Sequence, residues 1–142
     1  MLKIFGRLGK DRQSQLNDIG LLLLRVGLGL SMIYGHGWNK FVRMFGDDPI
    51  KFADPLGLGM ELSFYLVAIA EFVCAGLIVI GLFTRAASIP FIITMLVAVF
   101  LVHWPDSFGD KELALIYLVG SFVILIMGPG KYSLDDYLGK PK

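Results

Sequence analysis

The chain has 142 residues, of which 56% are hydrophobic and 18% are charged, and its mean hydropathy is +0.70. Soluble domains average roughly 45–50% apolar and ~25% charged residues, so this composition argues against a soluble enzyme domain. The net charge of +1 without a basic tract argues against a nucleic-acid partner, and the single cysteine, Cys74, excludes an internal disulfide and a CxxC redox or zinc site.

The chain begins with a polar, amphipathic segment. Its apolar and basic residues recur on opposite faces of a helix, Met1, Ile4, Phe5 and Leu8 against Lys3, Arg7 and Lys10. This pattern predicts a short amphipathic helix that lies on the inner leaflet of a membrane. No A-x-A-like cleavage site follows, which distinguishes the segment from a signal peptide.

Four apolar blocks follow, over residues 19–38, 63–83, 86–104 and 112–127. A helix needs about 20 apolar residues to cross a bilayer, so the first three blocks are long enough and the fourth is short. The blocks are continuous, whereas the strands of a membrane β-barrel alternate apolar and polar residues in segments of about 10. The sequence therefore predicts an all-α integral membrane four-helix bundle that forms a single domain.

The remaining segments also carry structural signals. Residues 39–60 contain three phenylalanines and two prolines, too apolar for a free linker, so we expect an outer loop that packs over the mouth of the bundle. Gly128-Pro129-Gly130 should end the fourth helix, because proline cannot continue it. Ser133 and Asp136 have the spacing of a capping box, which predicts a second short helix over residues 133–138.

The distribution of basic residues predicts the orientation. The N-terminal segment, the loop at Arg85 and the C-terminal tail together contain eight lysines and arginines, whereas the segments on the other side contain four. Because positive residues stay in the cytoplasm, both termini should be cytoplasmic, which agrees with an even number of spans. The sequence thus predicts a multi-pass protein of the cytoplasmic membrane.

Two charged residues lie inside the predicted spans, Arg25 and Glu71. Such residues are costly in lipid and usually face the interior of the bundle, where they mark function. We expect Glu71 near the midplane to be buried, in a functional network or in a purely structural one. For Arg25 two interpretations stay open: its side chain reaches the inner headgroups, or it neutralises Glu71.

A second polar group is expected near the outer interface. His36 and His103 should lie at matching depth, beside Glu112, Tyr34 and Tyr117. Two imidazoles with a carboxylate can move protons or hold a quinone headgroup, because histidine titrates near neutral pH. The plain alternative places both histidines in the interfacial belt with Trp38 and Trp104. A haem with two axial histidines, or a metal held by His36, His103 and Glu112, is less favoured.

Several motifs resemble those of the DoxX family of small bacterial membrane proteins. They are Leu24-Arg25-Val26-Gly27, Gly35-His36-Gly37-Trp38-Asn39-Lys40, Glu71, Gly81-Leu82-Phe83-Thr84-Arg85 and Gly128-Pro129-Gly130-Lys131-Tyr132-Ser133-Leu134-Asp135. The resemblance extends from about Asp18 to Asp136. It implies a four-helix bundle of the bacterial inner membrane, associated with quinone-linked oxidation of sulfur compounds or with complexes that handle oxidative stress. It also implies site roles for Arg25, His36, Lys40 and Glu71.

Two hypotheses of function follow. The first is a redox accessory subunit that interacts with a quinone. Its expected catalytic residues are Glu71, which exchanges a proton, and His36 and His103, which hydrogen-bond a quinone carbonyl; its expected ligand-binding residues are Arg25, Lys40, Glu112, Tyr34 and Tyr117, with no metal ligand. The alternative is a non-enzymatic scaffold or assembly factor that binds a partner protein or a second copy of the chain. A transporter or channel is the third and least favoured hypothesis, since no broken mid-span helix is visible in the pattern.

Overall fold

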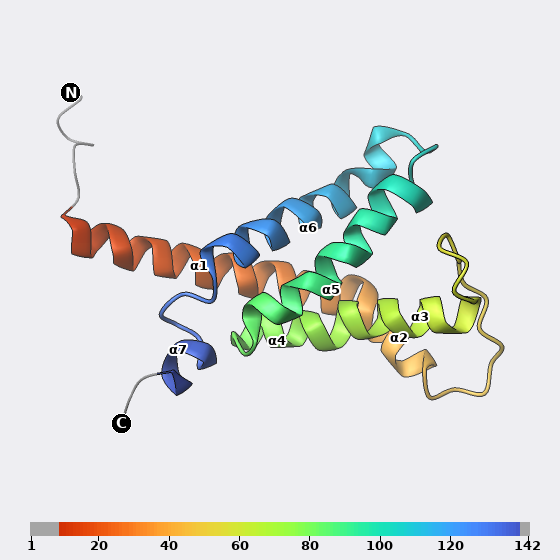
Figure 1. Ribbon diagram of the computed structural model, residues 1–142, viewed down its shortest axis with the longest axis horizontal. Coiled ribbons are helices and arrows are strands. Elements are labelled where there is room, and N and C mark those ends of the chain that lie inside the picture. Colours follow the sequence, from red (N-terminus) through yellow and green to blue (C-terminus); the bar gives the residue numbers. More distant parts are fainter. Residues whose placement is uncertain (1–8, 140–142) are drawn as a thin grey trace.

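The computed structural model describes residues 9–139, and every regular element in that range is helical. Three of these helices are long and apolar enough to cross a membrane. They span Lys10–Arg43, Met60–Ile80 and Thr84–Val102. The prediction of an all-α membrane bundle is therefore confirmed (Figure 1). The amphipathic helix predicted over Met1–Leu8 lies outside the described residues.

The first helix is continuous over 34 residues. It consists of α1 (Lys10–Met32), the π-helical segment η1 (Ile33–Gly37) and α2 (Trp38–Arg43). It extends past both ends of the predicted 19–38 range, and at ~1.5 Å per residue it is about 51 Å long. Part of the predicted outer loop 39–60 is therefore helical, and the connection between the first two helices is reduced to residues 44–59.

The second and third helices are joined by a tight turn. The second consists of α3 (Met60–Ala68), η2 (Ile69–Cys74) and α4 (Ala75–Ile80), and the third of α5 (Thr84–Val97) and η3 (Ala98–Val102). The predicted end of the second helix at residue 83 is wrong, because Gly81 has φ +74° and Phe83 has φ +48°. Residues in this left-handed region cannot continue a right-handed helix.

The fourth helix is α6 (Phe108–Met127), which begins before the predicted 112–127 range. It runs alongside α5 and packs against it (Figure 1). Its first five residues include Asp110, Lys111 and Glu112, so its uncharged part is short for a bilayer. Its crossing of the membrane stays a prediction.

The C-terminal end agrees with the capping signals. Gly128 has φ +82° and ends α6. After it, the Ser133 hydroxyl accepts a hydrogen bond from the backbone N–H of Asp136 at 3.2 Å, which caps the short helix α7 (Leu134–Leu138). The turn and the cap are therefore where the sequence placed them.

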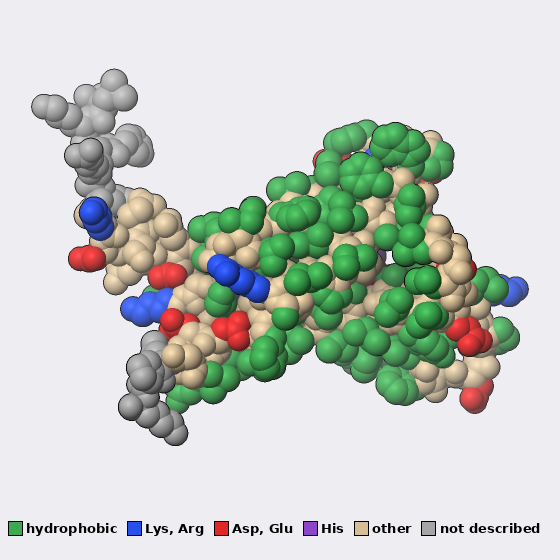
Figure 2. Space-filling model, viewed as in Figure 1, with side chains coloured by type: hydrophobic (Ala, Val, Ile, Leu, Met, Phe, Trp, Pro, Cys, Tyr) green, Lys and Arg blue, Asp and Glu red, His purple; other side chains and the backbone are tan. Residues whose placement is uncertain are grey.

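The helices pack through an apolar core and at glycines. The largest buried apolar side chains include Phe64, Phe91, Ile78 and Ile124. α1 packs against α4, and α5 packs against η2, α4 and α6. Hydrophobic side chains cover most of the surface between the ends of the molecule, and most charged side chains gather at the ends (Figure 2). This distribution suits a protein surrounded by lipid.

The helices separate toward the end that carries residues 44–59 and 103–107, which we call the outer end after the predicted orientation, and the opposite end the inner end. At the outer end the hairpin of α5 and α6 leans away from α3 (Figure 1). Within residues 9–139, α3 has no packing with α5, η3 or α6 that compares with the contact between α5 and η2. The surface is hollowed between the two lobes at this end (Figure 2). The separation makes room for the candidate site.

Candidate functional site

A cavity of about 380 Å³ lies in the outer half of the bundle. This volume is within the ~300–1,000 Å³ range of small-molecule sites. All four long helices and the loop of residues 44–59 contribute to its wall, which is mostly apolar. Its ionisable side chains are His36, Lys40, Glu71, His103, Asp110 and Tyr117. Five of the eight predicted site residues therefore line one cavity.

An ion pair lies on the wall of this cavity. Lys40 Nζ is 2.6 Å from Glu71 Oε2, and the Glu71 side chain is 9% exposed. The first and second helices touch at this level, since a Cβ on Gly37 would overlap the backbone carbonyl of Glu71. The buried carboxylate is thus paired with a cation from the neighbouring helix, and the partner is Lys40 instead of Arg25.

Three π-helical segments surround the cavity. His36 lies in η1, Glu71 lies in η2, and His103 directly follows η3. Single π-helical turns inside α-helices occur frequently at functional sites, because the wider turn redirects side chains. The sequence did not predict these segments, since the apolar pattern of a helix does not reveal a wider turn.

His36 and Tyr117 meet at the cavity from two different helices. Their rings are perpendicular, with centroids 6.1 Å apart. Tyr117 also contacts Phe91 edge to face, at 6.3 Å. These contacts hold the imidazole and the phenol in fixed positions beside the Lys40–Glu71 pair.

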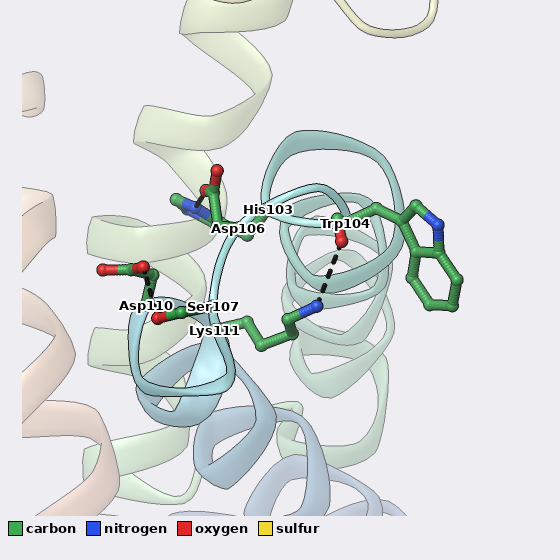
Figure 3. Close-up of polar contacts among 6 residues, drawn as sticks. All are labelled: His103, Trp104, Asp106, Ser107, Asp110 and Lys111. Carbon is green, nitrogen blue, oxygen red and sulfur yellow. Dashed lines mark hydrogen bonds and ion pairs between the residues drawn. The ribbon is translucent and has the colours of Figure 1, made fainter.

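The outer turn between η3 and α6 carries a set of polar contacts (Figure 3). His103 Nδ1 lies 2.8 Å from Asp106 Oδ2, and the Ser107 hydroxyl donates to Asp110 Oδ2 at 2.7 Å. Both residues of the His103–Asp106 pair are partly exposed. Asp106 and Asp110 were not among the predicted site residues. Asp106 could have been predicted from the sequence, because it follows the candidate residue His103 by only three positions.

The loop of residues 44–59 is held beside the cavity by Asp54. The Asp54 carboxylate accepts hydrogen bonds from the Ser63 hydroxyl at 2.8 Å and from the backbone N–H groups of Leu58 and Gly59. These bonds, that of Ser63 first, lower the pKa of Asp54 below its usual value. Phe52 and Leu56 of the same loop line the cavity. The loop packs over the site as predicted.

Arg25 lies away from this cavity, at the inner end of the bundle. Its side chain is fully buried, and Nη2 donates to the backbone carbonyl of Tyr132 at 2.5 Å. The two roles considered for Arg25, neutralisation of Glu71 and contact with the headgroups, are both wrong. The physical reason is the C-terminal segment, which folds back over the guanidinium and shields it from lipid and water.

Asp135 completes this inner arrangement. Its carboxylate accepts from the backbone N–H of Phe83 and from the N–H and hydroxyl of Thr84, at 2.8–2.9 Å, so it caps the N-terminus of α5. Desolvation raises the pKa of Asp135, but these hydrogen bonds and the charge of Arg25 outweigh it and lower the pKa below its usual value. We call this group the inner polar cluster; its members are Arg25, Gly81, Thr84, Tyr132, Ser133 and Asp135.

Two other predicted ligand-binding residues lie outside the cavity. Glu112 is exposed on α6, and Asp110, two residues earlier on the same helix, lines the cavity in its place. Tyr34 is 76% exposed on the outside of η1. Within the described range, no group of three or more His, Cys, Asp or Glu side chains is placed to hold a metal ion.

Comparison with known proteins places the chain in a family. The DoxX family model matches residues 20–104, more than half of the chain. The chain belongs to the DoxX family. Its resemblance to this family is thereby confirmed, and it is an integral membrane protein.

Three relatives cover most of this DoxX protein. "Putative oxidoreductase CatD" of Bacillus subtilis is 32% identical over 126 residues, which are 88% of this chain and 91% of the relative. "Uncharacterized membrane protein Rv3486" of Mycobacterium tuberculosis is 34% identical over 84% of this chain and 82% of its own length. "Inner membrane protein YqjF" of Escherichia coli is 29% identical over 89% of this chain and 97% of its own length. No solved structure matches the chain.

Proposed function

We propose that this DoxX protein is a quinone-interacting subunit of the bacterial inner membrane and that the outer cavity is its quinone site. The observation that carries the proposal is the cavity itself. It places His36, His103 and the Lys40–Glu71 pair on one mostly apolar wall, at the volume of a small-molecule site. The name of the CatD relative, which is that of an oxidoreductase, agrees with a redox role.

The side chains suit the chemistry of a quinone. Its ring is apolar and its two carbonyl oxygens accept hydrogen bonds, which His36 and His103 can donate from two different segments of the cavity wall. Glu71 exchanges a proton with the bound ring, and the Lys40 ammonium stabilises the carboxylate after the proton has left. The His103–Asp106 pair lies partly exposed and connects the cavity with the outer water.

Reduction of a quinone to a quinol takes up two electrons and two protons. We assign the protons to Glu71 and to the His103–Asp106 pair, and the electrons to a redox partner protein that docks on this subunit. The chain is thus an accessory subunit in this proposal, and it supplies binding, orientation and proton transfer.

The test compares Glu71→Gln with Glu61→Gln, a matched exposed carboxylate on the same helix. Purified protein in mild detergent is titrated with a decyl-chain benzoquinone, and quinone-coupled turnover is measured in native membranes. We expect Glu71→Gln to weaken binding about tenfold, since it breaks a charged pair, and to abolish turnover while the protein still folds. Glu61→Gln should match the wild type. Full turnover by Glu71→Gln would refute the role of Glu71.

The alternative of a scaffold or assembly factor gives a different result in the same preparation. It predicts a stable complex with a partner protein, no bound quinone, and variants that lose the partner. Native mass spectrometry of the mildly solubilised protein separates the two functions, because it detects a retained quinone and a retained protein in one spectrum.

The proposed orientation has both termini in the cytoplasm. It is supported by the bias of basic residues and by the name of the Escherichia coli relative, an inner membrane protein. Alkaline phosphatase requires disulfides and is active only outside the cytoplasm. A phosphatase fused after Asp48 should therefore be active, and one fused after Lys142 inactive. The reverse pattern would invert the topology.

A further inference from the structure

The rim of the outer cavity differs in chemistry from its interior. The interior carries the Lys40–Glu71 pair and His36. Six large apolar side chains line the cavity and are also substantially exposed, so they form most of its rim: Leu56, Leu58, Leu66, Ile93, Val102 and Leu113. The polar part of the rim is confined to His103 and Asp110, beside the turn between η3 and α6. Away from this turn the rim is apolar, which indicates an opening toward an apolar medium.

Two rim residues lie at membrane depth. Leu66 is 49% exposed on α3, and Ile93 is 53% exposed on α5. At ~1.5 Å per residue, Leu66 lies about 9 Å from the outer end of the second helix and Ile93 about 14 Å from that of the third. Both positions fall within the apolar core of a bilayer, which is about 30 Å thick. The medium at this part of the rim is therefore lipid.

The second and third helices are less closely packed at the same place. α5 packs against η2 and α4, whereas nothing comparable joins α3 to α5 in the part of the chain that the structure describes. The two helices diverge from there to the outer end (Figure 1). Leu66 and Ile93 both line the cavity, and we call the stretch of its rim between them the lateral portal.

The change from a polar interior to an apolar rim restricts the chemical class of ligand that fits the cavity. Glu71 lies about 16 Å from the outer end of its helix, too deep for the charged headgroup of a phospholipid to reach at low cost. A hydrocarbon tail that entered first would lie against the Lys40–Glu71 pair without satisfying it. An uncharged ring with hydrogen-bond acceptors, followed by a hydrocarbon chain, matches both parts.

We infer that the cavity is loaded from the outer leaflet through the lateral portal, by a long-chain quinone that enters ring first and leaves its chain between α3 and α5. This inference rests on the proposed function and adds the route and the class of quinone, membrane-bound and long-chained. The ring lies beside Lys40, Glu71 and His36, and the chain crosses the rim at Leu66 and Ile93. A quinone without a chain has no need of the portal.

The test narrows the portal with Leu66→Trp, Ile93→Trp and the double variant. Matched controls are Ile69→Trp and Ile89→Trp, which enlarge exposed residues of the same two helices away from the cavity wall. Each protein is titrated with two probes, a decyl-chain benzoquinone and the same ring without the chain. Bound quinone is quantified after the protein is separated from free micelles, and circular dichroism verifies the fold.

We expect the double variant to weaken binding of the decyl probe at least about tenfold, the effect of roughly 1.4 kcal/mol of steric cost, and to leave the chainless probe within about twofold. The two control variants should bind both probes normally.

The outcomes separate the two claims. If the double variant binds the decyl probe as the wild type does, the portal is wrong and the quinone site stands. If it loses both probes equally, the substitutions fill the cavity, and the portal is again wrong. If the wild type binds neither probe, the proposed function fails and the portal fails with it.

Discussion

The inner polar cluster and the outer cavity each contain a buried charged residue inside a membrane helix, but their surroundings differ. Arg25 is fully buried under the C-terminal segment and donates to a backbone carbonyl. Glu71 is paired with Lys40 on the wall of a cavity of about 380 Å³. The first residue is enclosed by its own chain, and the second faces a space that a ligand can enter.

The difference shows that a costly charge in a membrane helix has two explanations. At the inner end, Arg25 and Asp135 connect α1, the turn at Gly81 and the C-terminal segment, so the charges stabilise the fold. A Cβ on Gly81 would overlap the Arg25 guanidinium, so the guanidinium is packed closely against the turn. At the outer end the helices diverge, and the charges remain accessible for binding and proton transfer.

Asp135→Ala has the largest expected effect, and it tests whether the inner polar cluster acts on stability alone. It removes three hydrogen bonds at the start of α5 and leaves the buried Arg25 without its neighbouring negative charge. We expect a loss of about 3 kcal/mol in the free energy of unfolding, measured by denaturant titration in detergent, and unchanged quinone binding.

Asp47→Ala, at an exposed position in the outer loop, is the control and should change stability by less than about 0.5 kcal/mol. If the alanine variant does not insert, Asp135→Asn offers a milder test of the same bonds. A stable Asp135→Ala protein that no longer binds quinone would contradict the assignment of stability to the inner polar cluster and of binding to the outer cavity.

The Lys40–Glu71 pair is expected to contribute less to stability than Asp135. Lys40→Met leaves Glu71 in a nearly buried position without its cation, and we expect a loss of about 2 kcal/mol. The double variant Lys40→Met with Glu71→Gln should recover part of this loss, because no uncompensated charge remains. Unfolding free energies of the four proteins form a double-mutant cycle, in which we expect a coupling of about 1–3 kcal/mol. Additive effects would show that the pair contributes nothing to the fold.

The sequence predicted the helices well because the length of an apolar block is a direct physical signal for a membrane span. It predicted their ends less well. The third helix begins at Thr84 because Asp135 caps it, and these residues are 51 positions apart in the chain. A cap from a distant segment leaves no local pattern, so the turn at Gly81 was placed inside the predicted span.

An inaccurate helix end also explains why the sequence did not predict the partner of Glu71. With the first span predicted to end at residue 38, Lys40 fell in the outer loop, and Arg25 was the remaining cation inside a span. The first helix in fact continues to Arg43, which keeps Lys40 on the helix and within 2.6 Å of the carboxylate. The late start assumed for α6 likewise favoured Glu112 over Asp110.

Acid should affect the two regions unequally. The pKa of Asp135 is lower in the folded protein than its usual value of about 4, so the stabilisation from Asp135 is present above that pH and is lost as the pH falls toward the folded pKa. We expect the unfolding free energy of the wild type to fall below about pH 4 and that of Asp135→Asn to fall less. Parallel pH profiles of the two proteins would contradict the role of Asp135.

The smallest expected effect concerns the loop over the cavity. Asp54 accepts hydrogen bonds from Leu58, Gly59 and Ser63, so Asp54→Ala should release the loop without unfolding the bundle. Amide hydrogen exchange at Leu58 and Gly59 should become about fivefold faster, whereas Asp48→Ala in the same loop should leave it unchanged. If the quinone enters through the lateral portal, Asp54→Ala should bind the decyl probe as the wild type does, because the chain of the probe leaves between α3 and α5. A large loss of decyl binding in Asp54→Ala would instead show that the quinone chain depends on the ordered loop, and it would contradict lateral access between α3 and α5.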